Sequence, residues 1–99
     1  MYGTVAKAHV KPGALDQLDQ LTKDFGKLRV PGFIASYLYQ TDAASRECYL
    51  TVVFESKASY VANAESPEQD ARYQQMRVLF EDDPEWHDGE IVSFATAAG

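Results

Sequence analysis

Two histidines, and the carboxylates close to one of them, are the residues in this sequence whose types suit metal chemistry. His87 lies near Asp83 and Asp88, and His9 lies near the end of the first predicted strand. Imidazole nitrogens and a carboxylate oxygen together form a suitable ligand set for a divalent cation. No tight spacing such as His-x-x-x-His fixes both imidazoles on one element, however. A surface location for both histidines is the alternative, and we predict no metal site.

Cys48 is the one cysteine, so the sequence excludes an intrachain disulfide. It lies in an apolar segment, where a cysteine is more often a small core residue than a nucleophile. The sequence contains no glycine-rich phosphate loop, no Ser-His-Asp order and no Cys-His pairing, and we therefore predict no nucleotide cofactor and no hydrolytic triad.

The composition indicates one globular domain over residues 1–99, with a core of about 2–94 and a tail of small residues at 95–99. The net charge of −6 and the scattered basic residues argue against binding to nucleic acid or to an anionic membrane surface. No apolar stretch approaches the ~18 residues that span a bilayer. The first residues do not resemble a secretory leader, so we expect a cytoplasmic protein.

Apolar spacing predicts the elements that would position any site. Residues 2–10 form the first strand, which ends at Lys11-Pro12-Gly13. Leucine and phenylalanine then recur every three or four residues over 15–28, which indicates an amphipathic helix. Strands follow at 33–41 and 47–55, joined by a polar connection at 42–46. A last strand is predicted over 86–94.

A second helical region lies between the third and fourth strands and is predicted in two parts. Ser56 is suited to cap the first part. Ser66 as N-cap, Pro67 at the first helical position and Gln69 closing a capping box then predict a new start. The residue before a proline avoids helical angles, so Asp83 before Pro84 marks the end of the second part.

The order strand, helix, strand, strand, helix, strand favours an α+β, ferredoxin-like βαββαβ fold with a four-stranded antiparallel sheet in the order 4-1-3-2. In that order the first and last strands are neighbours, which places His9 and His87 at the same edge. The segments 33–39 and 49–54 barely alternate between apolar and polar residues, as in a sheet that is covered on both faces. A chain of 99 residues has too few elements to cover both faces, so we predict a homodimer that buries the second face.

Several aromatic side chains leave two interpretations open. Tyr37 and Tyr39 share a face of the second strand, and Tyr49 lies across the hairpin. They suit a sheet face or a dimer interface, and they also suit contact with a flat ligand. Trp86, at the edge of the last strand, is interpreted as a packing anchor rather than a stacking platform.

Four segments together resemble the antibiotic biosynthesis monooxygenase domain, a family of dimeric α+β barrels. These are Lys11-Pro12-Gly13, Val30-Pro31-Gly32-Phe33, the run Tyr-Leu-Thr-Val-Val-Phe-Glu-Ser at 49–56, and Ala64-Glu65-Ser66 followed by Tyr73. The resemblance covers about 2–94. It implies a dimer whose bare sheet faces pack together, and a cleft between the sheet and the second helical region. Characterised members include cofactor-free quinone-forming oxygenases, quinol oxygenases and haem-degrading enzymes.

The haem-degrading branch of that family relies on an asparagine on the first strand and on a tryptophan and a histidine in the second helical region. The corresponding positions here are Ala6 (or Lys7 in a shifted register), Asn63 and Tyr73. We therefore predict that the chain does not degrade haem and does not hold it through a histidine.

The cofactor-free oxygenases need less from the protein, because their phenolic substrate supplies the electrons. The resemblance makes Asn63 and Tyr73 the candidate catalytic pair, and Tyr60 and Met76 candidate substrate-binding walls. We predict a cofactor-independent monooxygenase acting on a small phenolic or quinol-like aromatic compound. The alternative is a non-catalytic small-molecule-binding or stress-associated homodimer, with Tyr73 and Met76 in the helix core and Asn63 in solvent.

Overall fold

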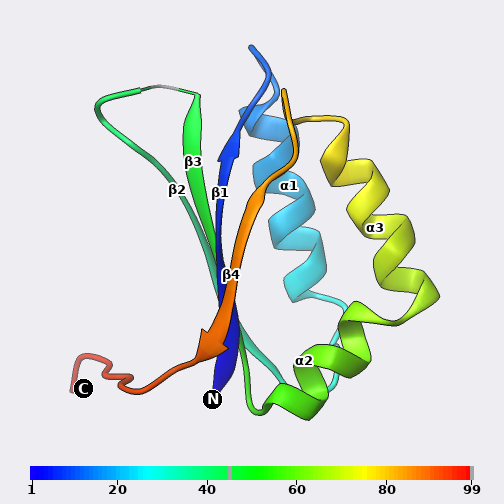
Figure 1. Ribbon diagram of the computed structural model, residues 1–99, viewed down its shortest axis with the longest axis vertical. Helices are drawn as coiled ribbons and strands as arrows, with labels where there is room; N and C mark the ends of the chain where they lie inside the picture. Colours follow the sequence, from blue (N-terminus) through cyan, green and yellow to red (C-terminus); the bar gives the residue numbers. More distant parts are fainter. Residues whose placement is uncertain (45, 99) are drawn as a thin grey trace.

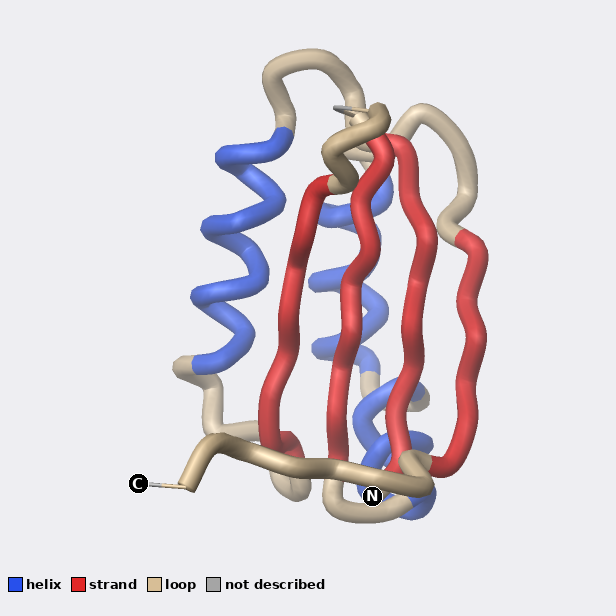
Figure 2. The backbone as a smooth tube through the Cα atoms, turned by 90° about the vertical axis from the view of Figure 1, so that its left-hand side faces the viewer, coloured by secondary structure: helices blue, strands red, loops and turns tan. Residues whose placement is uncertain are grey.

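The computed structural model describes residues 1–44 and 46–98, in which three helices cover one face of a four-stranded sheet (Figures 1 and 2). The elements follow in the order β1 (Tyr2–His9), α1 (Leu15–Gly26), β2 (Phe33–Gln40), β3 (Glu47–Phe54), α2 (Lys57–Ala64), α3 (Pro67–Arg77) and β4 (Glu85–Glu90). The strands lie in the order β2-β3-β1-β4, and every neighbouring pair is antiparallel. This confirms the ferredoxin-like fold and the predicted strand order.

The packed core occupies one end of the space between the sheet and the helices. On β1, the small side chains of Ala6 and Ala8 face the helices and are buried, which lets α1 approach closely at that end. The core cluster contains Ala8, Val10, Ala14, Leu18, Cys48, Leu79 and Phe80. These residues come from the end of β1, the start of α1, the start of β3 and the segment after α3. The opposite end of the interface is therefore left for a cleft.

Two separate caps produce the predicted break in the second helical region. The Ser56 side chain accepts a hydrogen bond from the Ser59 backbone N–H, and the Ser59 side chain completes a capping box. Ser66 caps α3 by accepting from the backbone N–H of Gln69, with Pro67 at the start of the helix. The prediction that Gln69 closes this second box was wrong, because its side-chain oxygen accepts from Arg72 instead.

The C-terminal ends of α3 and β4 both differ from the prediction. α3 ends at Arg77 rather than near Asp83, because the chain then turns to form an isolated bridge between Val10 and Phe80. β4 ends at Glu90 rather than at residue 94. Its last register pair with β1 is Glu90 with Tyr2, and the backbone N–H of Ile91 then donates to the Met1 carbonyl oxygen. Figure 2 shows the following segment crossing the strand ends on the face opposite the helices.

That opposite face is largely uncovered and carries aromatic and apolar side chains. Val5 is 42% exposed, Tyr37 61% and Tyr39 55%. The rings of Tyr39 and Tyr49 stack with their centroids 5.4 Å apart. Cys48, on the covered face, is a core residue as predicted, and burial raises the pKa of its thiol. In the described ranges, no helix is long and apolar enough to cross a membrane.

Candidate functional site

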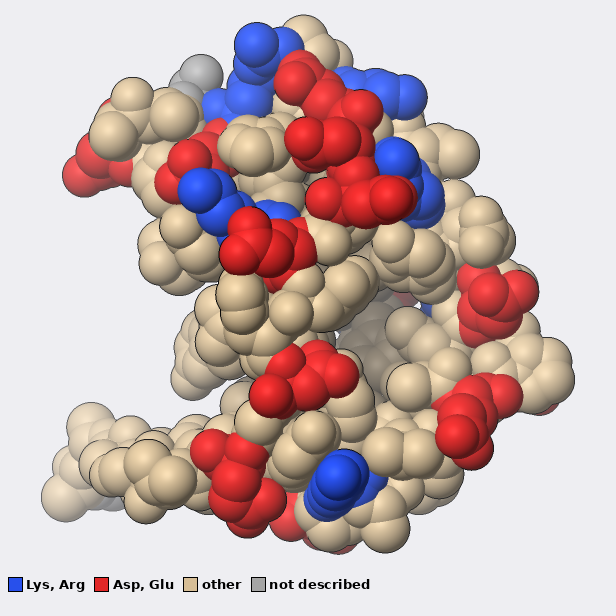
Figure 3. Space-filling view, in the orientation of Figure 1, with Lys and Arg blue, Asp and Glu red and all other residues tan. Residues whose placement is uncertain are grey.

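A cleft of about 440 Å³ lies between the sheet and the helices, at the end opposite the packed core. Figure 3 shows it as a hollow in the middle of one face of the molecule. Its walls are mainly apolar and aromatic, contributed by Leu21, Phe25, Leu50, Val52, Phe54, Met76 and Trp86. This volume and lining suit a small, flat organic ligand.

All four site residues predicted from the sequence line this cleft: Tyr60, Asn63, Tyr73 and Met76. Tyr60 and Asn63 come from α2, whereas Tyr73 and Met76 come from α3. In the described ranges, no hydrogen bond joins Asn63 to Tyr73. The Tyr73 ring instead lies against Trp86, with centroids 6.0 Å apart and planes tilted by 56°. Trp86 thus packs against a neighbouring ring and also lines the cleft, with 41% of its surface exposed.

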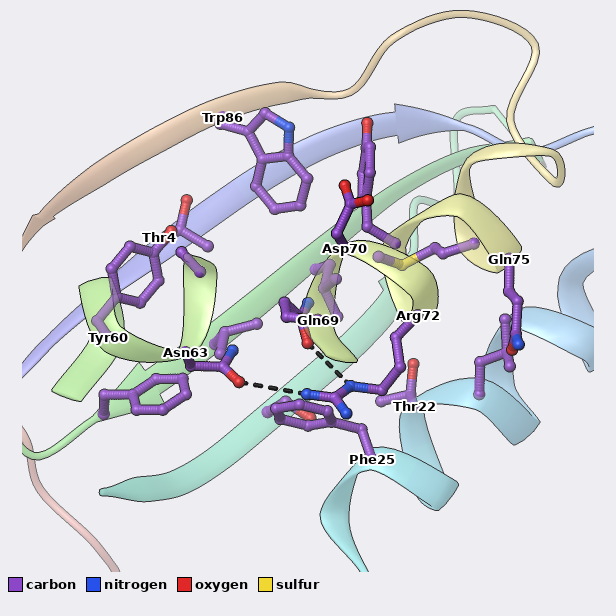
Figure 4. Close-up of a pocket in the computed structure, with 18 of the residues that line it drawn as sticks. Thr4, Thr22, Phe25, Tyr60, Asn63, Gln69, Asp70, Arg72, Gln75 and Trp86 are labelled. Atoms are coloured by element: carbon purple, nitrogen blue, oxygen red, sulfur yellow. Dashed lines mark hydrogen bonds between the residues drawn. The ribbon is translucent and has the colours of Figure 1, made fainter. Parts of the chain in front are cut away.

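Arg72 brings a positive charge to one side of the cleft, near Asn63 (Figure 4). Its Nε donates to Gln69 Oε1 at 3.0 Å, and its Nη2 donates to Asn63 Oδ1 at 3.3 Å. The guanidinium carbon lies 5.4 Å from the centre of the Phe25 ring on α1. Two amides and an aromatic face thus hold the guanidinium in a fixed orientation.

A second polar group lies on the other side of the cleft. The Tyr60 hydroxyl donates to Asp88 Oδ1 at 2.9 Å. Burial, the hydrogen bond to Asp88 and the charge of Asp88 raise the pKa of Tyr60 to about 12, while the Thr4 hydroxyl beside it opposes the rise. Thr4 is only 4% exposed, and its Oγ1 makes no hydrogen bond of normal geometry in the described structure. The pKa of Tyr60 is therefore raised although the buried Thr4 hydroxyl lies beside it.

Sequence reasoning missed Arg72, Gln69, Thr4 and Asp88, although signals for them were present. Gln69, Arg72, Tyr73 and Met76 follow the spacing i, i+3, i+4 and i+7, which marks one face of a helix. Polar residues on the same stripe as Tyr73 and Met76 indicate a helix face that looks onto a cleft. Thr4 and Asp88 are register partners on β1 and β4, and both face the helices. That pairing depends on the register of distant strands, which the sequence did not fix.

The two histidines do not come together. His87 pairs with Val5, whereas His9 pairs with Glu47 further along β1. Each has its own carboxylate: His9 Nδ1 lies 3.4 Å from Asp82 Oδ1, and His87 Nε2 lies 2.9 Å from Glu85 Oε1. In the ranges 1–44 and 46–98, no group of three or more His, Cys, Asp or Glu side chains could hold a metal ion.

A comparison of the sequence with models of known protein families agrees with this fold. The family model for antibiotic biosynthesis monooxygenases matches residues 1–74. The chain therefore belongs to the antibiotic biosynthesis monooxygenase family. No curated protein gives a match to the chain.

Solved structures of distant sequence share this fold. An asparagine-to-alanine mutant of SnoaB, a cofactor-independent oxygenase from Streptomyces nogalater, is 15% identical, with 94% of both chains covered and a TM-score of 0.79. A Chloroflexus aurantiacus protein, provisionally described as an antibiotic biosynthesis monooxygenase, is 23% identical over 96% of both chains, with a TM-score of 0.76. Rv0793 from Mycobacterium tuberculosis is 16% identical over 96% of this chain and 98% of that one, with a TM-score of 0.73. At these identities the likeness shows the fold alone.

Proposed function

We propose that this protein is a cofactor-independent monooxygenase that oxidises a small phenolic or quinol-like aromatic compound in the cleft. The observation that carries the proposal is an apolar cleft with a polar group on either side, Asn63 with Arg72 and Tyr60 with Asp88. Membership of the monooxygenase family and the SnoaB-like fold support it.

The reaction needs no electron source other than the substrate. In an anthrone-like compound, a base removes a proton from the ring CH₂, and the carbanion passes one electron to O₂. Recombination forms a C–O bond and, with a proton, a hydroperoxide. Loss of water then leaves a carbonyl, so that one oxygen atom of O₂ enters the product and the other leaves as water.

The cleft residues suit separate parts of this chemistry. The Arg72 guanidinium, oriented by Asn63, stabilises the negative charge that develops on the substrate oxygen. The Tyr60 hydroxyl stays protonated and donates its one proton to Asp88, so it is not the base, and its oxygen is left to accept a hydrogen bond from the substrate hydroxyl. Asp70, a cleft carboxylate that extends toward the Trp86 side in Figure 4, is the proposed base.

Oxygen uptake tests this function. The purified protein is mixed with anthrone-like and hydroquinone compounds while dissolved O₂ and quinone absorbance are followed. We expect one O₂ consumed per CH₂ oxidised to C=O, with lower rates for Asp70→Asn and Tyr73→Phe. Tyr39→Phe, on the far face of the sheet, is the control and should keep the wild-type rate. Uptake no faster than in protein-free buffer would reject the proposal. Binding without uptake would support a non-catalytic binding protein instead.

We also propose that the protein is a cytoplasmic homodimer built through the uncovered sheet face. Val5, Tyr37 and Tyr39 leave an exposed apolar and aromatic surface there, and a stable interface buries at least ~1,000 Å² in total. Val5→Arg should produce monomers, measured by light scattering. The apolar run at 49–54 alone would suggest Val52 or Val53 as the position for this arginine substitution. Both are less suitable for the test, because Val52 lines the cleft and Val53 is only 4% exposed within the protomer.

A further inference from the structure

Arg72 is a cation in a mainly apolar cleft. Among the described residues that line the cleft it is the sole basic one. In the ranges 1–44 and 46–98 it forms no ion pair with a carboxylate, whereas Arg46 pairs with Glu81 and Arg77 pairs with Asp83. The chain has 15 acidic and 9 basic residues, so an arginine that is held by neutral amides alone calls for an explanation.

The contacts of Arg72 leave its anion-binding capacity unused. A guanidinium has five N–H donors, and two of them donate to Gln69 and Asn63. The remaining donors belong to a guanidinium whose central carbon lies 5.4 Å from the centre of the Phe25 ring. An arginine fixed in this way is suited to bind a planar carboxylate through two parallel hydrogen bonds.

The acids of the cleft do not use this capacity. Asp70 also lines the cleft, but the hydrogen bonds of Arg72 in the described ranges go to Gln69 and Asn63. Asp24 Oδ1 accepts from Gln20 Nε2 at 2.9 Å along α1. With a net charge of −6, the protein as a whole repels anions, so the Arg72 side is the place in the cleft that favours one.

We infer that the ligand of the cleft is an aromatic carboxylic acid that also carries a ring hydroxyl. Its carboxylate binds the Arg72 guanidinium, and its ring packs against Met76 and Trp86. Its hydroxyl lies on the other side of the cleft, where the Tyr60 oxygen, whose own proton is donated to Asp88, accepts a hydrogen bond from it. The oxidation of this acid rests on the proposed function, whereas its binding does not.

Arg72 could instead be a purely structural link between α3 and α1, since it contacts Phe25. A structural link requires no negative charge on the ligand. The two explanations therefore differ in whether the cleft distinguishes a carboxylate from a neutral group of the same shape.

A matched pair of probes tests the difference. 6-Hydroxy-2-naphthoate and its amide, 6-hydroxy-2-naphthamide, share one shape with the hydroxyl at the far end of the ring system, but they differ in charge. Their affinities are measured by calorimetry, and quenching of Trp86, the one tryptophan, locates them in the cleft. Since a hydrogen bond to a charged group is markedly stronger than a neutral one, we expect the acid to bind at least about tenfold more tightly.

Variants then assign the preference to one side chain. Arg72→Gln should reduce the ratio to within about threefold, and Arg72→Lys should keep part of it, because lysine retains the charge without the planar fork. Arg77→Gln is the matched control on the same helix, and it should leave the ratio unchanged because Arg77 pairs with Asp83 outside the cleft. Circular dichroism checks that each variant folds.

Equal affinity of the acid and the amide for the wild-type protein would overturn the inference, and this comparison does not depend on any variant folding. A preference that survives Arg72→Gln would overturn it as well. Tight, Arg72-dependent binding of the acid without oxygen uptake would support the inference while rejecting the proposed function, so the two can fail separately.

Discussion

Replacing Thr4 by valine should stabilise the protein. Thr4 is 4% exposed, and its Oγ1 has no hydrogen-bond partner of normal geometry in the described ranges. Leaving a buried hydroxyl unsatisfied costs about 1–3 kcal/mol, whereas valine has nearly the same shape without that group. We expect Thr4→Val to raise the free energy of unfolding by about 1 kcal/mol.

Chemical and thermal denaturation at one fixed protein concentration would measure the effect, since dimerisation makes stability depend on concentration. For a domain of this size, 1 kcal/mol shifts the melting temperature by about 4–8 °C. Thr22→Val is the matched control, because Thr22 Oγ1 donates to the Leu18 carbonyl oxygen at 3.0 Å. Losing that hydrogen bond should cost about 0.5–1 kcal/mol.

The two valine variants should therefore change stability in opposite directions. If Thr4→Val destabilises the protein as much as Thr22→Val does, the Thr4 hydroxyl already has a partner in the ligand-free protein. The reasoning that this hydroxyl is buried without a partner would then be refuted.

Three further predictions follow from other features of the structure. Asp88→Asn should lower the pKa of Tyr60 from about 12 toward 10. Tyrosinate absorbance measures this pKa, with Tyr60→Phe as the reference. If the tyrosine that titrates near pH 12 is unchanged in Asp88→Asn, the effect of Asp88 on Tyr60 is contradicted. Because folding favours the protonated phenol, the free energy of unfolding of the wild type should fall as pH rises from about 10 toward 12, and this fall should be smaller in Tyr60→Phe. Gly3→Ala should destabilise by about 3 kcal/mol or more, because a Cβ there collides with the Val52 carbonyl oxygen. Gly89 is the register partner of Gly3 and has open space around it, so Gly89→Ala should leave the free energy of unfolding nearly unchanged. Urea denaturation compares the two variants, and equal destabilisation by Gly3→Ala and Gly89→Ala would refute the steric reasoning.

The sequence predicted the fold well because each strand and each helix carries its own local signal. The apolar spacing over α1 and the cap formed by Ser66 and Pro67 are properties of neighbouring residues, and the structure has both. The end of β4 was misplaced because the extent of a strand depends on pairing with a segment distant in sequence. The register of β4 with β1 runs from Glu85 to Glu90, and no local signal in the apolar residues after Glu90 marks this end.

The candidate site was only partly predictable, for a related reason. Tyr60, Asn63, Tyr73 and Met76 were placed in one region through the family resemblance, and all four line the cleft. Arg72 enters the site because the Gln69 side chain turns toward it rather than back to the cap of α3. Either arrangement gives the side-chain oxygen of Gln69 a hydrogen-bond donor, and the local sequence does not distinguish them.

The contact between Asn63 and Arg72 also changes what Asn63 can do. An arginine only donates hydrogen bonds, so the amide oxygen of Asn63 must face it, and this fixes the orientation of the amide group. The oxygen is then committed to Arg72, while the NH₂ group keeps its two donors for the cleft. Asn63 therefore acts on a ligand in two ways: it positions the guanidinium, and it offers donors to an oxygen of the ligand. A base needs an acceptor, so Asn63 stabilises charge in this cleft, and proton removal is left to a carboxylate.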